Sequence, residues 1–298
     1  MLKRLHNLIA RRLSHGQDGA ECGFTLIELA IVLAVVSLLI GMGLEGYARS
    51  LDNAKRKTSA ERMDKIEDAI TLFAIQNNYL PCPADGQLNS ADANFGRSLG
   101  GGLDTTTSCT AITNGAHVVP WITLGLDEIY SRDGWGNRIT YYAIGGRAQA
   151  SVTNGSINYH ASASTTDGIQ RSTTSYPYGR VLVFNLAAVP AYTTGQLTNS
   201  SDNAQTGCNA TVSICAAYVL VSHGSHASGA YTGSNNPTRI SVTDASAGEA
   251  ANNDGDAFFV QNDPTERASA SGIFDDIVRW RSAQSIVSSC GTGACGNP

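Results

Sequence analysis

Residues 23–44 read GFTLIELAIVLAVVSLLIGMGL, and this stretch decides the architecture of the chain. From Phe24 to Leu44 there are 21 residues, and Glu28 is the only one that carries a charge. A helix of this length spans about 30 Å, which is the thickness of the hydrocarbon core of a bilayer. We therefore expect residues 24–44 to form a transmembrane helix. A carboxylate inside such a segment is costly, and this marks Glu28 as a functional residue.

The segment before the apolar stretch is basic and ends in a glycine. Lys3, Arg4, Arg11 and Arg12 precede Gly23, and the apolar residues follow it. In an ordinary secretory signal the cleavage site comes after the apolar region. A cut at Gly23 would instead leave the apolar helix on the mature protein.

Residues 23–28 and the apolar run that follows resemble the class III leader of type IV prepilins and type II secretion pseudopilins. The resemblance implies that a membrane prepilin peptidase cuts between Gly23 and Phe24 and methylates the new amine of Phe24. It also implies that Glu28 meets the N-terminal amine of a neighbouring subunit during assembly. One alternative is an ordinary signal anchor with an isolated glutamate. Another is a Glu28 that pairs with its own N-terminus or is protonated at the membrane edge.

Charge and motifs argue against two classes of function. The chain has a net charge of −5, and without residues 1–23 it keeps 16 basic and 23 acidic residues. Nucleic acid is not an expected partner, because phosphate binding needs clustered cations. No phosphate-loop motif and no His-Glu-x-x-His motif occurs, and we find no assembled catalytic constellation. We therefore expect a protein that is not an enzyme.

The helix is expected to continue beyond the membrane. Residues 45–78 contain no proline and one glycine, and apolar residues recur from Met63 to Ala74 at three- and four-residue steps. We expect one helix from about Phe24 to about Asn78, with one face of its second half packed on a sheet. The two prolines that follow cannot continue it.

The rest of the chain alternates polar loops with short apolar strands. Strands are expected at 138–142, 180–185 and 217–222, with weaker candidates at 238–243 and 257–261. The segments 84–116 and 145–178 are rich in glycine, serine and threonine and are expected to be loops. The expected organisation is a leader at 1–23, a helix at 24–78 and an exported domain at 79–298. The fold class is α+β, in which the long helix packs on an antiparallel sheet of four to six strands with long disulfide-tethered loops.

Two segments of the exported domain also resemble pseudopilins. Residues 133–142 resemble the turn and first strand of that family, with Trp135 expected to be buried against the helix. Residues 217–222 and 274–280 resemble the C-terminal half of the major pseudopilin, where a loop binds calcium through aspartates and backbone carbonyls.

Asp275 and Asp276 match the calcium motif and are candidate calcium ligands. The chain departs from the family pattern, because about 50 residues separate Ser222 from Asp275 where the family has a short loop. Residues 252–256 are a second oxygen-rich candidate, and the alternative for all these acids is a solvated turn. His223 and His226 are expected to be loop histidines that face solvent.

Six cysteines remain after removal of the leader: Cys82, Cys109, Cys208, Cys215, Cys290 and Cys295. An even number in an exported domain indicates disulfides, and six cysteines allow 15 connectivities. We expect neighbours to pair, as Cys82–Cys109, Cys208–Cys215 and Cys290–Cys295. The alternative is a zinc site, but no pair has the two-residue spacing that zinc motifs favour.

The resemblance implies a structural function, that of a minor type IV pilin or a pseudopilin. Such a subunit is held in the inner membrane by its helix, with its distal domain in the periplasm, and then joins a pilus or a type II secretion pseudopilus. Its partners are other pilin or pseudopilin subunits, the prepilin peptidase and the assembly platform protein, and no cofactor is expected apart from calcium. The alternative is a pilus-anchored adhesin whose segments 84–116 and 145–178 contact a surface or a glycan.

Overall fold

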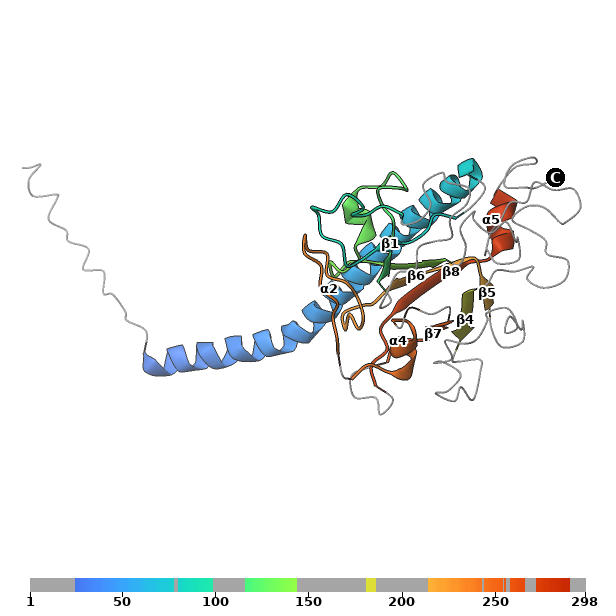
Figure 1. The fold of residues 1–298 in the computed structure, drawn as a ribbon. Helices are drawn as coiled ribbons and strands as arrows, with labels where there is room; N and C mark the ends of the chain where they lie inside the picture. The colour runs from blue at the N-terminus through green and yellow to red at the C-terminus, as the bar shows by residue number, and fades with distance from the viewer. Residues whose placement is uncertain are drawn as a thin grey trace, which may run out of the picture. The chain divides into compact units, whose positions relative to one another are not determined.

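A computed structural model of the chain describes residues 25–77, 80–98, 116–143, 181–185, 214–242, 244–253, 255, 258–265 and 272–289. The chain divides into two compact units, Met1–Leu51 and Asp52–Pro298. One helix, α2 (Leu26–Asn77), contributes its first half to the first unit and its second half to the second unit (Figure 1). The single long helix expected from the sequence is confirmed.

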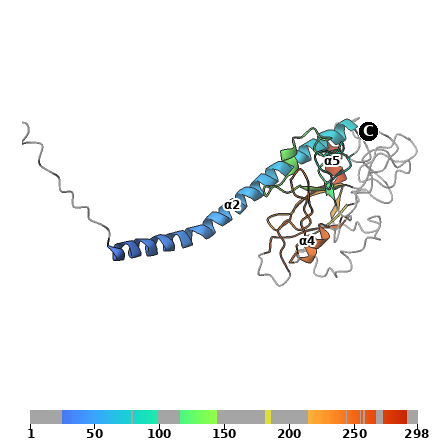
Figure 2. The same ribbon diagram turned by 60° about the vertical axis from the view of Figure 1, so that its left-hand side comes forward.

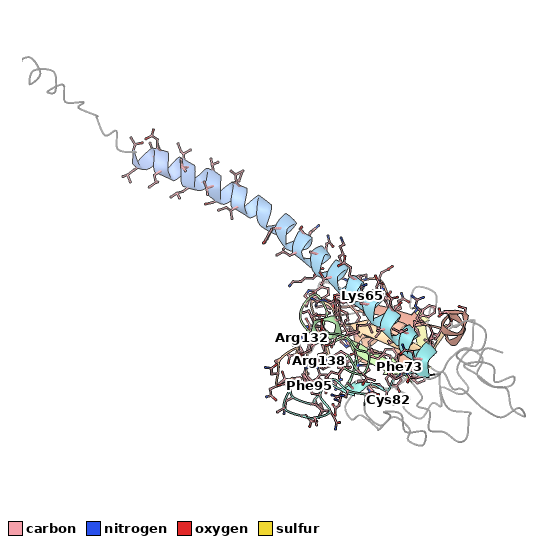
Figure 3. The ribbon with its side chains drawn as sticks, turned by 90° about the horizontal axis from the view of Figure 1, so that it is seen from above. Lys65, Phe73, Cys82, Phe95, Arg132 and Arg138 are labelled. Carbon is pink, nitrogen blue, oxygen red and sulfur yellow. The ribbon has the colours of Figure 1, made fainter. Side chains whose placement is uncertain are left out.

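In the first unit, the apolar side chains of α2 point outward all around the helix (Figure 3). Leu26 is 88% exposed and Leu38 is 65% exposed. A helix that is apolar on every side is stable in lipid or in a helix bundle, not in water. Among the described residues, α2 is the one helix that is long and apolar enough to cross a membrane.

In the second unit, α2 packs on a five-stranded antiparallel sheet, which confirms the expected α+β class. Its buried residues include Met63, Ile66 and Ile70, which share a core with Tyr141 and Leu220 of the sheet. The strand order is β1 (Ala84–Asp85), β2 (His117–Val118), β3 (Thr140–Ala143), β6 (Tyr218–Ser222) and β8 (Ile277–Arg281), and every neighbouring pair is antiparallel.

A second sheet of three strands covers the other face of the first sheet. Its order is β5 (Ile214–Ala216), β4 (Val181–Asn185) and β7 (Phe258–Gln261), with β4 and β7 parallel. Val183 and Phe259 of this sheet pack on Val219 and Val221 of β6. All five residues of β6 are therefore buried, which explains why this strand is a continuous apolar run. Residues 181–185 form a strand, as predicted from the sequence. The apolar pattern of this strand is typical of a central sheet, like that of 217–222, but the strand lies in the second sheet, so the sequence did not predict its placement correctly.

Three short helices complete the described elements. They are the 3-10 helix η2 (Glu128–Ser131), α4 (Ala247–Ala251) and α5 (Ala283–Ser289). Figures 1 and 2 both show α5 beside the C-terminal end of α2 and α4 on the side of the domain away from α2. Ile286 of α5 belongs to the core that α2 forms with the sheet.

The turn Asp133–Asn137 attaches the start of β3 to α2. The Gly134 amide donates a hydrogen bond to Ser59 Oγ at 2.8 Å, and Arg62 Nη1 donates to the carbonyl of Asp133 at 2.8 Å. A Cβ atom on Gly134 would overlap the carbonyl of Lys55. The turn thus touches the helix backbone directly, and only glycine fits at its second position.

Trp135 lies against α2 as expected, but it is half-buried and not fully buried. It faces a charged residue of α2, because the Arg56 guanidinium lies 5.7 Å from its ring centroid. The buried tryptophan of this region is Trp121, whose ring meets Phe95 edge-on at 5.0 Å. The guanidinium of Arg138 lies 4.8 Å from both of these rings, and Figure 3 shows it beside Phe95.

Two predictions from the sequence differ from the structure at the level of short segments. Residues 84–85 form β1 and do not belong to a loop, and residues 238–242 contribute only the isolated bridge of Arg239 to Tyr231. Residues 99–115 and 144–180 lie outside the described residues, so the adhesin alternative that depends on them stays a prediction.

One of the six predicted disulfide cysteines has a described side chain. Cys82 is disulfide-bonded, and its partner is not among the side chains that the structure describes. Cys109, Cys208, Cys290 and Cys295 lie outside the described residues, as does the side chain of Cys215. The three pairings stay predictions.

Candidate functional site

The start of α2 is closed by a capping box between Thr25 and Glu28. The Thr25 amide and the Thr25 hydroxyl each donate to Glu28 Oε2 at 2.9 Å. The Glu28 amide donates in return to Thr25 Oγ1 at 3.3 Å. This reciprocal pattern satisfies donors that the first turn of a helix would otherwise leave free.

In the single chain, the carboxylate of Glu28 therefore has a partner in its own first turn. The side chain is exposed, together with the apolar residues that flank it. Gly23 and Phe24 lie outside the described residues, so the cleavage site and the pairing of Glu28 with an amine stay predictions.

A second candidate site lies at the beginning of β8. Asp275, Asp276 and Glu249 bring one oxygen each to within 4.8 Å of one another. Asp275 and Asp276 are each 5% exposed, and Glu249 is fully buried. The alternative that Asp275 and Asp276 lie in a solvated turn is excluded, because both are buried. The structure adds a third carboxylate that the sequence did not indicate.

Asp275 fixes the loop that follows β6. Its Oδ2 accepts hydrogen bonds from the Ser225 amide at 2.7 Å, the Ser225 hydroxyl at 2.8 Å and the His226 amide at 2.9 Å. The Asp275 amide donates to Glu249 Oε1 at 3.0 Å. A Cβ atom on Gly224 would overlap the Asp275 side chain, and Gly224 has φ +58, so glycine is required there.

Asp276 is bound to the turn that follows α4. Its Oδ2 accepts from Asn252 Nδ2 at 2.8 Å. The Asn252 side chain also bonds both backbone groups of Val260 in β7. Asn252, in the second oxygen-rich segment predicted from the sequence, therefore lies next to the acidic cluster and orients one of its members.

His223 and His226 do not face solvent, and that expectation is wrong. His223 is 1% exposed; its Nε2 lies 2.8 Å from Thr140 Oγ1 and its Nδ1 lies 3.5 Å from Asp276 Oδ1. His226 lies between two carboxylates, with Nδ1 2.7 Å from Glu249 Oε2 and Nε2 2.7 Å from Asp244 Oδ1. Both rings point into the protein, where they are polar partners of the buried carboxylates of Asp276 and Glu249.

The electrostatics of the cluster follow from burial and like charge. Burial, followed by the negative charge of Asp276, raises the pKa of Glu249 to about 7. Burial alone would lower the pKa of His226, but its hydrogen bonds to Asp244 and Glu249 outweigh burial and raise that pKa. The ionised form of Glu249 is therefore disfavoured in the cluster unless a further positive charge lies beside it.

The donor set fits a hard divalent cation. Asp275 Oδ1 and Asp276 Oδ1 are buried without a hydrogen-bond partner, and so is His223 Nδ1 beside them. In the part of the chain that the structure describes, no lysine or arginine pairs with the three carboxylates. Buried carboxylates are normally paired or coordinate a metal, and calcium prefers oxygen ligands.

Sequence reasoning missed Glu249 because it lies 26 positions before Asp275, in a segment without a counterpart in the resemblance. A local signal was present. Ser246 and Glu249 have capping-box spacing, and Ser246 Oγ accepts from the Glu249 amide at 3.3 Å. That signal predicts a helix start, but it says nothing about what the glutamate contacts.

One motif in the sequence carries no site among the described residues. Residues 96–100 read GRSLG and so match Gly-x-Ser-x-Gly. The described part, residues 96–98, lies in a turn region and not at the end of a strand, and the Ser98 amide donates to Thr123 Oγ1. The motif needs a strand before its serine to expose the hydroxyl, and that context is missing.

Comparison with known proteins gives one match. The family model described as "Prokaryotic N-terminal methylation motif" matches residues 19–44. No curated protein and no solved structure matches the chain. The matched residues include Gly23, Glu28 and the apolar first part of α2, so the class III leader motif predicted from residues 23–44 is confirmed.

Proposed function

Because residues 19–44 carry the N-terminal methylation motif, which supports the type IV pilin and pseudopilin family, we propose that the mature chain is a minor subunit of a pilus or a type II secretion pseudopilus. The subunit is held in the inner membrane by residues 24–44 and has its distal domain in the periplasm. The prepilin peptidase cuts after Gly23 and methylates Phe24. The family is a structural one, and its members associate with other pilin subunits.

The observation that carries this proposal is the division of α2 into two surfaces. Its first half exposes apolar side chains on all sides, and one face of its second half is buried in the domain core. The first half can therefore pass from lipid into a bundle of similar helices without changing its own fold. The second half keeps the domain attached to that helix, as a filament subunit requires.

The second sheet supports a minor subunit rather than a bulk repeating one. It covers the face of the first sheet that lies opposite α2, and two of its strands, β4 and β5, come before β6 in the sequence while β7 comes after it. This added layer leaves the packing of α2 on the first sheet intact. It enlarges the domain on the side away from the helix, where a rare subunit presents its own surface.

Calcium at Asp275 and Asp276 is the second part of the proposed function. Their Oδ1 atoms support it, because both are buried and accept no hydrogen bond from the described residues. A bound ion would supply the missing positive charge and hold the start of β8 against the loop after β6. Loss of calcium binding in Asp275→Asn with Asp276→Asn, measured by calorimetric titration of the detergent-solubilised chain, is the expected result.

Processing tests the main proposal directly. Mass spectrometry of the membrane-bound and filament-bound protein is expected to find a mature chain that begins at methylated Phe24. Gly23→Leu should leave the full-length chain in the inner membrane, whereas the control Gly16→Leu in the same leader should be cleaved normally. A mature start beyond Leu44, or normal cleavage of the Gly23→Leu chain, would contradict the proposal. In sheared filaments the protein should be scarce relative to the main subunit.

A further inference from the structure

A long segment, residues 223–276, connects β6 to β8 and includes α4 and β7. Three parts of it meet at the acidic cluster. Its beginning contacts Asp275 through Ser225 and His226, its middle contacts Asp275 and Asp276 through Glu249 and Asn252, and its end supplies the two aspartates.

We propose that Glu249 is a third ligand of the cation, and that the cation thereby closes the segment 223–276 onto the start of β8. The inference rests on the calcium site proposed above and adds to it a ligand and a structural role. The cation would join α4 to β8, two elements whose cluster residues lie 26 positions apart in the sequence.

Two sets of contacts fix the position of Glu249: the cap at the start of α4 and the packing of α4 on β7. Ser246 caps α4, so Glu249 lies in the first turn with its amide bound to Ser246 Oγ. On the other side, α4 packs on β7 through a core of Ala251, Val260 and Phe274. A Cβ atom on Gly248 would lie 3.2 Å from the Val260 side chain of β7 and 3.0 Å from the Phe274 ring, so the helix lies close to the strand. The packing of α4 therefore places the Glu249 carboxylate beside the aspartates, and its position does not depend on a flexible side chain alone.

Glu249 adds a third buried carboxylate to the two aspartates, and this makes a bound cation more favourable than it would be for the aspartates alone. Its only cationic neighbour among the described residues is His226, which Asp244 shares. The three carboxylates have two histidines beside them, His223 next to Asp276 and His226 between Glu249 and Asp244, so the negative groups outnumber the available positive ones. Like charges at this separation repel. A calcium ion with several oxygen ligands would turn that repulsion into attraction.

Closure has a structural consequence that can be measured. With calcium, the beginning, middle and end of the segment are joined at one point. Without calcium, repulsion between Glu249 and the aspartates favours opening, and the amides of residues 224–253 should exchange faster with solvent.

The experiment compares the mature chain in detergent with Glu249→Gln and with the control Asp244→Asn. Asp244 contacts His226 on its far side from the cluster, so its change should leave calcium affinity within about threefold. Glu249→Gln should weaken calcium binding at least about tenfold in calorimetric titration, because it removes a charged ligand. Calcium should slow hydrogen exchange of residues 224–253 in the wild type and in Asp244→Asn, and have little effect in Glu249→Gln.

Thermal unfolding separates this inference from simple misfolding of the variant. Without calcium, Glu249→Gln should unfold at a higher temperature than the wild type, because repulsion is relieved. With calcium, the order should reverse. A wild-type chain that binds no calcium overturns the proposed cation site itself. If Glu249→Gln and the wild type bind calcium equally well, the site stays in place and the role of Glu249 as a ligand is overturned. If Glu249→Gln binds calcium more weakly but calcium slows hydrogen exchange of residues 224–253 equally in both proteins, the closure of the segment is overturned.

Discussion

At the start of α2, Glu28 has two competing partners, its own first turn and a neighbouring subunit. In the single chain it is the acid of a capping box with Thr25. Buried in an apolar helix bundle, the same carboxylate would lose water, and an unpaired buried charge is destabilising by several kcal/mol. The Phe24 amine that cleavage creates is a cation, and no lysine or arginine occurs between Arg12 and Arg49.

Glu28→Ala should therefore leave cleavage and the folded domain intact and reduce incorporation into filaments about tenfold or more, which corresponds to at least about 1.4 kcal/mol. Quantitative immunoblots of sheared filaments against the membrane fraction measure this. Ser37→Ala is a matched control in the same segment, since its hydroxyl only bonds the Leu33 carbonyl. Normal incorporation of Glu28→Ala would refute the pairing and favour a subunit at the capping position.

His117 in β2 gives the domain a pH dependence of known sign. Its ring meets Tyr142 edge-on at 4.9 Å, and burial lowers the pKa of His117 to about 4 from its usual 6.5. Because the folded pKa lies below the unfolded one, protonation favours unfolding. The stabilisation is fully present above about pH 6.5 and is lost as the pH falls toward 4.

Urea unfolding at pH 7, 5 and 4 should show the wild type losing up to about 3 kcal/mol more than His117→Phe over this range. Phenylalanine keeps the aromatic contact with Tyr142 and does not titrate. Other titrating groups cancel in the difference between the two proteins. Parallel pH profiles for the two proteins would show that His117 does not contribute.

At the scale of elements, the attachment of β3 to α2 depends on one glycine. The Gly134 amide bonds Ser59 Oγ, and a Cβ atom there would overlap the carbonyl of Lys55. That neighbour is helix backbone, so it cannot move aside as a flexible side chain would.

Gly134→Ala is expected to destabilise the second unit by about 1–3 kcal/mol, as overpacking does in a tight core. Urea unfolding followed by tryptophan fluorescence measures the change. Gly46→Ala is the control, because nothing lies within 4 Å of the added atom and alanine favours a helix by up to about 1 kcal/mol. Equal stability of Gly134→Ala and wild type would mean that the turn is not pressed on the helix.

At the scale of the whole molecule, disulfides are expected to restrain a domain that is rich in loops. Peptide mapping without reduction should find Cys82–Cys109, Cys208–Cys215 and Cys290–Cys295, each typically worth about 2–4 kcal/mol. Cys82 is disulfide-bonded in the described part of the domain. Free thiols at Cys290 and Cys295 in periplasmic material would contradict the third pair.

The sequence by itself determined the features that are local along the chain. The leader motif, the length of α2, its buried face from Met63 to Ala74 and the apolar strand at 218–222 are all written in consecutive residues or in a short period. Asp275 and Asp276 were also found this way, because they form part of a short motif. Such signals need no knowledge of what lies across space.

The tertiary structure alone decided which distant residues meet. It placed 181–185 in a second sheet, turned His223 and His226 inward, left Trp135 half-buried and brought Glu249 to the two aspartates. None of these contacts has a local signature, because a strand pattern does not name its partner and a capping glutamate looks the same beside solvent or beside a buried acid. Burial and like charge make Glu249 a candidate ligand, and both arise only when α4 packs on β7 and β8 begins beside it.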